Sequence, residues 1–139
     1  MAFSYSIQIN DKLEDHEVPG LRESVGWARR DEDYPALIDH CLLWGSARDE
    51  SGRLVAFGYI TGPGFAFEHG YMEDVIVHPD EQGKGLGKSL VRSLLWAAEG
   101  KGLSIVTVNY SKRHESFYKE AGFTPCGGAV WRAEEAEKE

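Results

Sequence analysis

The chain has 139 residues, of which 42% are apolar and 27% are charged, and its formal net charge is −8. This length suits one domain with a sizeable core, and this composition excludes a disordered or fibrous chain. The acid excess argues against a protein that coats the phosphate backbone of nucleic acid, which would need surplus Lys and Arg. We therefore expect one domain over residues 1–132, followed by a solvated acidic tail over 133–139.

Cysteine usage and the apolar runs argue against a metal site and a membrane span. Cys41 and Cys126 are the two cysteines, and neither lies in a CxxC pair or beside a histidine at ligand spacing. No run of 18 apolar residues occurs, and the first residues lack the basic and apolar regions of a targeting signal. We expect a reduced, cytoplasmic protein without a metal, a nucleic acid or a membrane as partner.

The first half of the chain carries both strand and helix patterns. Residues 3–9 place apolar side chains at every second position, which predicts a half-buried edge strand. Over 19–27 and 33–43 the apolar residues recur at three and four positions, which predicts two short helices. Aromatic and β-branched residues over 54–60 and 71–77 predict two strands, separated by a loop rich in Gly and Pro.

The second half of the chain alternates helix and strand. Leucines four residues apart predict an amphipathic helix over 86–98. A buried strand over 103–108 and a helix over 112–121 follow, and two short strands are expected over 123–125 and 129–132. This alternation predicts a mixed α/β sheet with helices packed on it.

The stretch EQGKGLGKSL, Glu81 to Leu90, has the composition of a phosphate-binding loop between a strand and a helix. Free backbone N–H groups and the positive end of a helix meet there, which favours an anion. A triphosphate loop GxxxxGK[ST] would require Gly where Gln82 stands, and a dinucleotide fingerprint GxGxxG started at Gly85 meets Leu90 in place of its last glycine. Neither nucleotide motif fits, so other residues have to identify the anion.

The run VIVHPDEQGKGLGKSLV resembles the central motif of the GCN5-related N-acetyltransferases (GNAT), an apolar strand that leads into a V-x-x-x-x-[QR]-x-x-G-x-[GA] loop and a helix. Four residues occupy every position of that motif: Val77, Gln82, Gly85 and Gly87. The later stretch SFYKEAGF, 116–123, is similar to the family's late helix with its FYxxxGF ending. The two motifs stand in the family's order and spacing, so the resemblance covers about residues 71–123.

This resemblance implies a single-domain GNAT-like fold with a mixed, mostly antiparallel central sheet flanked by helices. It also implies an N-acetyltransferase that moves an acetyl group from acetyl-CoA, as co-substrate, to a primary amine, here expected on a small molecule. The N–H groups of the loop would bind the pyrophosphate, and its glycines allow close approach because they lack a Cβ. The implied cofactor-binding residues are Val75, Ile76, Val77, Gln82, Gly83, Lys84, Gly85, Leu86, Gly87, Lys88, Ser111 and Tyr118.

The same resemblance supplies a general acid. It places the hydroxyl of Tyr118 near the thioester sulfur, where it would protonate the leaving thiolate. A phenol, with an ordinary pKa of about 10, is protonated at neutral pH. It further implies that the strand Val75 to Val77 separates from its neighbour and offers backbone groups to the pantetheine arm.

For the base that removes the amine's proton, the acidic pair Glu73 and Asp74 precedes the cofactor segment. Adjacent strand residues point to opposite faces, and Glu73 is expected to share its face with Val75 and Val77, so it is preferred. The alternatives are His78, His114 or a chain of water molecules.

Two positions depart from the family pattern. Ser111 stands where many members carry Asn, and His114 stands where a small residue is usual. Ser111 can still hydrogen-bond the pantetheine arm or cap the helix, whereas His114 leaves the shape of the cofactor tunnel undetermined.

In the family the acceptor pocket is built from the first two helices, their link and the loop before the central strand. Aromatic rings in an acidic protein favour a small cationic or aromatic amine, although the same rings could equally be core. The candidates are Trp27, Arg29, Arg30, Tyr34, Trp44, Phe65 and Phe67. The alternative function is a non-catalytic acyl-CoA-binding module or sensor, and whether the chain forms a homodimer stays open.

Overall fold

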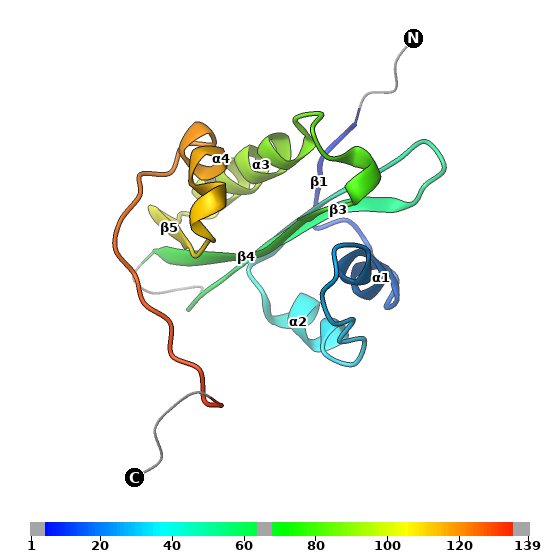
Figure 1. The fold of residues 1–139 in the computed structure, drawn as a ribbon, viewed down its shortest axis with the longest axis horizontal. Helices are drawn as coiled ribbons and strands as arrows, with labels where there is room; N and C mark the ends of the chain where they lie inside the picture. The colour runs from blue at the N-terminus through cyan, green and yellow to red at the C-terminus, as the bar shows by residue number, and fades with distance from the viewer. Residues whose placement is uncertain (1–4, 64–67, 135–139) are drawn as a thin grey trace.

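The computed structural model describes residues 5–63 and 68–134, and its centre is a five-stranded sheet in the order β1-β2-β3-β4-β5 (Figure 1). The strands are β1 (Gln8–Ile9), β2 (Leu43–Arg48), β3 (Leu54–Thr61), β4 (His69–Val77) and β5 (Ile105–Val108). The strands β1 to β4 pair antiparallel, whereas β5 runs parallel to β4. This arrangement confirms the expected mixed, mostly antiparallel sheet.

Helices cover both faces of the sheet (Figure 1). They are α1 (Glu17–Ser24), α2 (Tyr34–His40), α3 (Leu86–Gly100) and α4 (Glu115–Glu120), with 3-10 turns η1 (Pro79–Glu81) and η2 (Lys112–His114) before α3 and α4. Residues of α1 and α2 pack with Phe57, Tyr59 and Ile76 in one apolar cluster. Residues of α3 and α4 pack with Met72 and other strand residues in a second cluster on the opposite face. We call these the α1–α2 face and the α3 face.

The helix α3 lies close to the sheet because two strands present glycine to it. Leu94 of α3 is fully buried. A Cβ at Gly45 of β2 or at Gly58 of β3 would stand 3.1 Å from a methyl carbon of Leu94. The leucine stripe that the sequence predicts as a helix face is therefore the face that contacts the sheet.

Several boundaries differ from the sequence prediction. Of the strand expected over 3–9, Gln8–Ile9 pairs with β2, and residues 3–4 lie outside the described residues. The helix expected over 33–43 ends at His40, because Leu43 already pairs with Ile60 as the first residue of β2. Pairing across the sheet overrides the helical spacing at this point.

The two strands expected over 123–125 and 129–132 are wrong. Among the described residues, 123–134 contain no strand, and this segment runs away from the sheet (Figure 1). Val130 and Trp131 are 65% and 75% exposed. An extended apolar segment becomes a strand only when a neighbour takes up its hydrogen bonds, and no described strand does so here.

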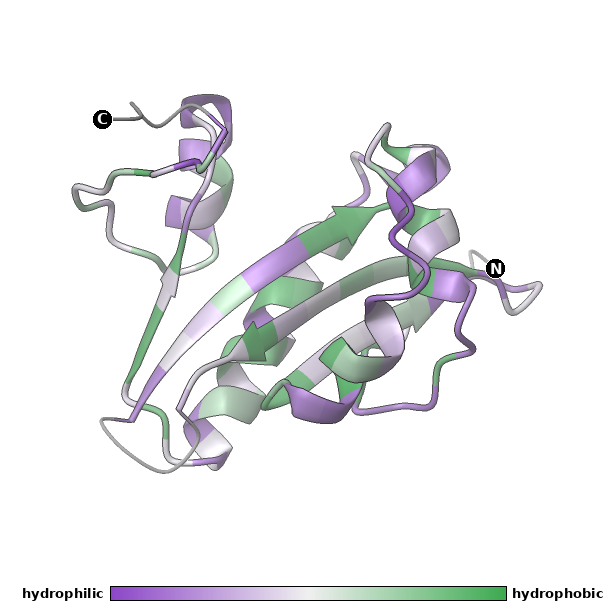
Figure 2. Cartoon of the chain, turned by 90° about the horizontal axis from the view of Figure 1, so that it is seen from below, coloured by the Kyte–Doolittle hydropathy of each residue, from purple (hydrophilic) through white to green (hydrophobic). Residues whose placement is uncertain are grey.

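The strands β4 and β5 separate midway along β4. They pair from His69–Ile105 to Met72–Val108. From Glu73 onward the described residues of β4 have no partner on that side, because the chain leaves β4 after Val108, the last residue of β5 (Figure 1, Figure 2). The separation that the family resemblance implied is therefore present, and it opens one edge of β4.

A β-bulge interrupts β4 at the same level. Tyr59 of β3 pairs with Glu73 and Phe57 pairs with Ile76, so both Asp74 and Val75 oppose Gly58. Asp74 takes up the extra residue with a left-handed φ of 52°. The alternation of side chains is broken here, so the expectation that Glu73 shares a face with Val75 and Val77 is wrong.

None of the helices in the described part of the chain is long and apolar enough to cross a membrane. Within the same residues, no group of three His, Cys, Asp or Glu side chains could hold a metal ion.

Replacement of Leu94 by Ala should lower the free energy of unfolding by about 2–5 kcal/mol, because it leaves a cavity between α3 and the sheet. Urea unfolding followed by circular dichroism measures this change. Trp96→Ala is the matched control on the same helix, since this side chain is 77% exposed, and it should change the free energy by less than about 0.5 kcal/mol. Equal losses in the two variants would contradict the packing described here.

Candidate active site

The glycine-rich loop between η1 and α3 has an open, left-handed backbone. Gly83 and Gly85 have φ angles of 80° and 81°. A Cβ at either position would meet no atom within 4 Å, so the loop is not held by close packing. Glycine is required there for its conformation, because other residues pay a steric cost in the left-handed region.

The backbone N–H groups at the start of α3 are available to a ligand. In residues 5–63 and 68–134, no N–H group from Gly83 to Lys88 donates to a backbone carbonyl. The first helical N–H that does so belongs to Ser89, which donates to the Gly85 oxygen at 3.1 Å. Free N–H groups at the positive end of a 15-residue helix form an anion site.

The structure explains why position 82 of the glycine-loop motif is Gln and position 87 is Gly. The side-chain Nε2 of Gln82 donates to the Val77 carbonyl oxygen at 2.9 Å and ties the loop to β4. At Gly87, a Cβ would lie 3.2 Å from a ring carbon of Phe117 and 3.4 Å from Val77 Cγ2. Gln82 therefore holds the loop, and Gly87 lets α3 approach α4 and β4.

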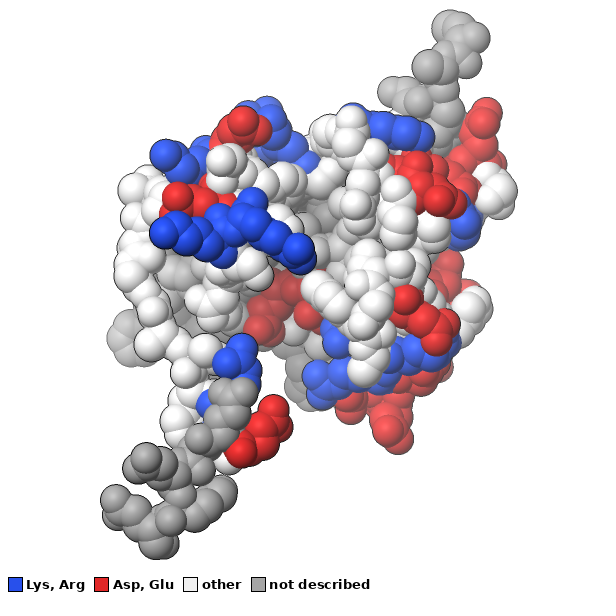
Figure 3. Space-filling model, in the orientation of Figure 1, with Lys and Arg blue, Asp and Glu red and all other residues white. Residues whose placement is uncertain are grey.

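The lysines of the loop are both paired with carboxylates. Lys84 Nζ lies 2.9 Å from Glu81 Oε2, and Lys88 Nζ lies 2.9 Å from Glu120 Oε2. The hydrogen bond from Lys88 lowers the pKa of Glu120. On the face that Figure 3 shows, basic and acidic side chains are interspersed. An anion at the loop would therefore meet free backbone N–H groups more than unpaired lysine charge.

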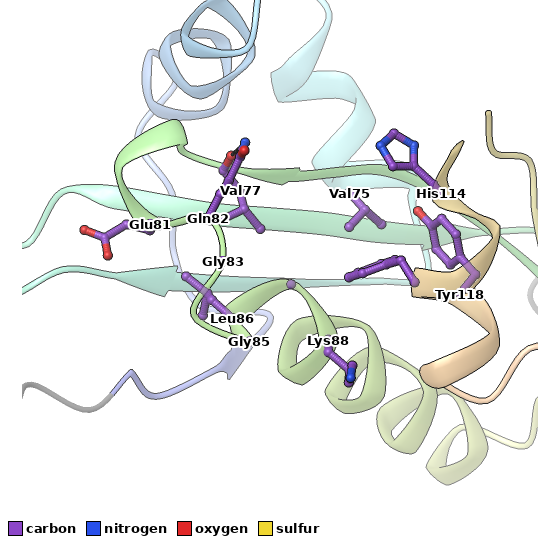
Figure 4. Close-up of a pocket in the computed structure, with 12 residues that line it drawn as sticks. Val75, Val77, Glu81, Gln82, Gly83, Gly85, Leu86, Lys88, His114 and Tyr118 are labelled. Carbon is purple, nitrogen blue, oxygen red and sulfur yellow. Dashed lines mark hydrogen bonds between the residues drawn. The ribbon is translucent and has the colours of Figure 1, made fainter. Parts of the chain in front are cut away.

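A cavity of about 400 Å³ lies between the loop, the open edge of β4 and α4 (Figure 4). Its lining consists of Val75, Val77, Glu81, Gln82, Gly83, Gly85, Leu86, Gly87, Lys88, His114, Phe117 and Tyr118. Most of the predicted cofactor-binding residues are thus brought together. Three do not line the cavity: Ile76, Lys84 and Ser111.

These three exceptions have local reasons. The side chain of Ile76 is buried on the α1–α2 face, opposite the cavity. Lys84 turns to Glu81. Ser111 precedes η2, and its side chain makes no capping hydrogen bond.

The open edge of β4 presents backbone groups beside the cavity. His78 N–H donates to the Val55 oxygen of β3 at 2.8 Å, and bonded residues alternate along an antiparallel strand. This alternation turns the backbone groups of Val75 and Val77 away from β3, toward the side that β5 has left. The bond from Gln82 to the Val77 oxygen fits this orientation.

Tyr118 lies at the α4 end of the cavity in an aromatic cluster. Its ring stacks on Tyr110 at 5.2 Å and meets Phe117 and Phe123 edge-on at 4.9 and 5.6 Å. Figure 4 shows its hydroxyl oxygen on the side of Val75. Burial raises the pKa of Tyr118 above 10.0, so its hydroxyl stays protonated and can donate a proton.

The bulge gives the adjacent carboxylates of Glu73 and Asp74 different partners on the α1–α2 face. Asp74 accepts a hydrogen bond from the Tyr34 hydroxyl and forms an ion pair with Arg22 at 3.0 Å. Glu73 accepts a hydrogen bond from the Tyr59 hydroxyl at 2.7 Å. Asp74 is therefore neutralised by a cation, whereas Glu73 is held by a neutral phenol.

Both phenols are fixed as donors. Burial, and then the hydrogen bond to Asp74, raise the pKa of Tyr34 well above its usual range. Burial, and then the hydrogen bond to Glu73, do the same for the pKa of Tyr59. Neither hydroxyl ionises near neutral pH.

The residues predicted for the acceptor pocket divide into two groups. Two of them contact the carboxylate network, by which we mean Glu73, Asp74 and their partners Tyr59, Tyr34 and Arg22. Tyr34 donates to Asp74, and the Arg22 guanidinium lies 5.2 Å from the centre of the Trp27 ring. The others lie apart from that network or outside the described residues. Arg29 and Arg30 are paired with Asp31 and Asp33, Trp44 donates to the Asp11 oxygen, and Phe65 and Phe67 are not described.

Arg22 and Tyr59 were not predicted from the sequence as residues of the site. Arg22 stands in a helix among other charged residues, and nothing in its spacing marks it as the partner of Asp74, 52 positions later. Tyr59 meets Glu73 through the register of β3 and β4. The one available signal was a polar aromatic residue inside a strand that is otherwise apolar.

A family model and several related proteins all match this chain to acetyltransferases. The acetyltransferase (GNAT) family model matches residues 7–123. The chain is 34% identical over 110 residues to serotonin N-acetyltransferase 2, chloroplastic, of Oryza sativa subsp. japonica, which covers 76% of this chain and 54% of that protein. It is 34% identical over 110 residues to glucosamine 6-phosphate N-acetyltransferase 1 of the same plant. This match covers 76% of this chain and 66% of that protein.

A third relative is the uncharacterized N-acetyltransferase ycf52 of Gracilaria tenuistipitata var. liui, 26% identical over 119 residues, covering 84% of this chain and 65% of that protein. The chain thus spans between 54% and 66% of the length of these three relatives.

Solved structures share the fold. A Trypanosoma brucei acetyltransferase superposes with a TM-score of 0.76 at 21% identity, covering 93% of this chain and 99% of that one. Glucosamine-6-phosphate N-acetyltransferase from Arabidopsis thaliana superposes with a TM-score of 0.74 at 22% identity, covering 94% and 98%. At these identities the similarity concerns the fold alone.

Replacement of Gly85 by Ala should weaken the binding of acetyl-CoA about 5- to 30-fold, because a residue with a Cβ pays about 1–2 kcal/mol in the left-handed conformation that the loop requires. Isothermal titration calorimetry measures the Kd. Gly100→Ala is the matched control, since a Cβ there meets no atom within 4 Å and its φ is not left-handed, and its Kd should stay unchanged. An unchanged Kd for Gly85→Ala would rule out this loop as the anion site.

Proposed function

Because the chain belongs to the acetyltransferase (GNAT) family, we propose that it is an N-acetyltransferase that moves an acetyl group from acetyl-CoA to the primary amine of a small molecule. One observation carries this proposal. The free N–H groups at the start of α3 and the hydroxyl-bearing ring of Tyr118 line the same cavity. An anion site and a proton donor in one cavity suit a substrate that carries both phosphates and a leaving thiolate.

The lining of the cavity fits acetyl-CoA as the acetyl donor. The N–H groups from Gly83 to Lys88 would bind the pyrophosphate, and the turned-out backbone groups of Val75 and Val77 would pair with the pantetheine arm. The apolar side chains of Val75, Val77 and Phe117 would keep water from the thioester. Acetyl-CoA supplies the activated acetyl group, and the chain supplies binding, orientation and proton transfer.

The reaction requires two proton transfers. The amine nitrogen attacks the thioester carbonyl carbon, a C–N bond forms, and the C–S bond breaks to leave a thiolate. Tyr118 gives its hydroxyl proton to that thiolate, and a base takes the proton that the amine loses. We assign the base to Glu73, which follows the last residue of β4 that pairs with β5. Its carboxylate would approach the acceptor amine from the α1–α2 face. The alternatives are His114, which lines the cavity, and a chain of water molecules.

The charges of the α1–α2 face support a cationic or aromatic amine as acceptor. Arg22, Arg29 and Arg30 are each paired with a carboxylate, whereas Glu73 forms no ion pair within residues 5–63 and 68–134. A phosphate group on the acceptor would be favoured by a free cation or by free backbone N–H groups on this face, and these three arginines are already paired. Of the two amines in the names of the rice relatives, serotonin therefore suits this face better than glucosamine 6-phosphate.

Incubation with acetyl-CoA and a panel of amines, with detection of free thiol, tests the function. The panel includes serotonin, other arylalkylamines, polyamines and glucosamine 6-phosphate. Thiol release that depends on an amine supports the enzyme. Binding of acetyl-CoA without turnover supports the alternative of an acyl-CoA sensor, and binding of ATP in place of acetyl-CoA would overturn both.

Replacement of Tyr118 by Phe should lower kcat about 10²-fold with an unchanged Kd for acetyl-CoA, because the ring keeps its packing while the proton donor is lost. Since burial raises the pKa of Tyr118, the parent rate should not fall on the alkaline side below about pH 10. Steady-state kinetics over pH 6–10 measure both. A kcat that matches the parent would remove the general-acid role.

Location and oligomeric state stay predictions. The sequence predicts a cytoplasmic protein, whereas relatives from rice and Arabidopsis thaliana carry the word chloroplastic in their names. For a homodimer, the exposed Ile105 on the edge strand β5 and the exposed Val130 and Trp131 favour association of two copies. Light scattering of the full chain measures its mass.

A further inference from the structure

We propose that Tyr59 is a positioning residue, which orients the Glu73 carboxylate toward the acceptor amine through the hydrogen bond from its hydroxyl. This inference rests on the proposed function, in which Glu73 is the base. It concerns a residue of β3 that belongs to neither family motif.

The bulge at Asp74 decides where Glu73 lies. Without the extra residue, Glu73 would face the same side as Val75 and Val77, which line the cavity. With it, Glu73 lies on the α1–α2 face, next to Asp74. The ion pair between Asp74 and Arg22 of α1, together with the bond from Tyr34 of α2, holds the bulge in place.

The two carboxylates are not equivalent as proton acceptors. Asp74 accepts from Tyr34 and from Arg22, so a guanidinium already offsets its charge. Within the described chain, Glu73 has one hydrogen-bond donor, Tyr59, which occupies Oε2. Its second oxygen is left for the amine. Glu73 is therefore the carboxylate that can take up a proton from a bound acceptor.

Tyr59 has the rigidity that positioning requires. It pairs directly with Glu73 across the two strands, and such cross-strand neighbours lie within side-chain reach. Its side chain is 7% exposed. Its ring packs on Phe57 at 6.2 Å, and Phe57 meets Tyr34 edge-on at 6.1 Å. The hydroxyl is thus fixed in place by the core, whereas a free glutamate would sample several rotamers.

Two paired strands therefore supply two different functions, since Tyr59 of β3 positions a carboxylate and Glu73 of β4 supplies it. The apolar cluster of the α1–α2 face fixes the ring of Tyr59, and the Tyr59 hydroxyl orients the Glu73 carboxylate by a hydrogen bond. Glu73 would then accept the proton of the bound amine. Loss of the hydroxyl alone leaves the ring packing intact and releases the carboxylate. A misplaced catalytic group lowers the rate even when the fold is unchanged.

The test is a double-mutant cycle with Tyr59→Phe, Glu73→Gln and the double variant, measured as kcat/KM for the best amine of the panel. We expect Glu73→Gln to lower kcat/KM about 10²-fold and Tyr59→Phe to lower it about 10-fold. In the Glu73→Gln background, Tyr59→Phe should have almost no further effect, because the group that it orients is already inactive. The Kd for acetyl-CoA and the melting temperature should stay near those of the parent.

Tyr71→Phe is the matched control. Tyr71 lies on β4 near Glu73, since burial and then the charge of Glu73 raise the pKa of Tyr71, but its hydroxyl is hydrogen-bonded to Asn109. It therefore tests the loss of a nearby hydroxyl that does not bond to Glu73. Its effect on kcat/KM should be the same with Glu73 and with Gln at position 73.

Four results would overturn the proposal. Equal effects of Tyr59→Phe in both backgrounds would make Tyr59 a structural residue, and an unchanged rate would remove its role. Full activity of Glu73→Gln would show that Glu73 is not the base, while continued amine-dependent thiol release would leave the proposed acetyl transfer intact. Absence of thiol release from the parent with every amine would instead overturn the proposed function, and this inference with it.

Discussion

The left-handed conformation of Asp74 in the middle of β4 is the constraint on which the rest of the site depends. A non-glycine residue in this region costs on the order of 1–3 kcal/mol and persists where its surroundings fix it. Arg22 and Tyr34 supply that fixation from α1 and α2. Because of the extra residue, β4 turns Val75 and Val77 to the cavity and turns Glu73 and Asp74 to the α1–α2 face. One strand thereby separates an apolar, backbone-rich side from a side that carries carboxylates.

This separation explains how a chain with a net charge of −8 can offer a site to an anion. The proposed anion site consists of N–H groups at the start of α3, and these dipoles need no surplus of Lys or Arg. The two lysines of the loop are already paired with Glu81 and Glu120. In the proposed function, a carboxylate of the α1–α2 face serves the cationic acceptor amine. Net charge therefore says little about a site that binds through the backbone.

Local patterns predicted the elements whose partners are near in sequence. The leucine stripe predicted α3, and the glycine loop with the FYxxxGF stretch predicted the cavity wall, because these signals depend on helix period and backbone freedom. The strand predicted over 129–132 failed, since β-propensity does not provide a hydrogen-bonding neighbour. The helix predicted over 33–43 ends early because a hydrogen-bonding neighbour is present: Leu43 and the residues after it pair with β3.

The sequence by itself determined the fold class, the glycine-rich loop before α3 and the position of Tyr118, because motif spacing and helix period encode them within a few residues. The tertiary structure alone decided which way Glu73 points, since a one-residue bulge reverses the alternation that a strand pattern assumes. It also decided the partners of that carboxylate pair. Arg22 and Tyr59 lie 52 and 14 positions from Asp74 and Glu73, and only the packing of α1 and the register of β3 bring them together.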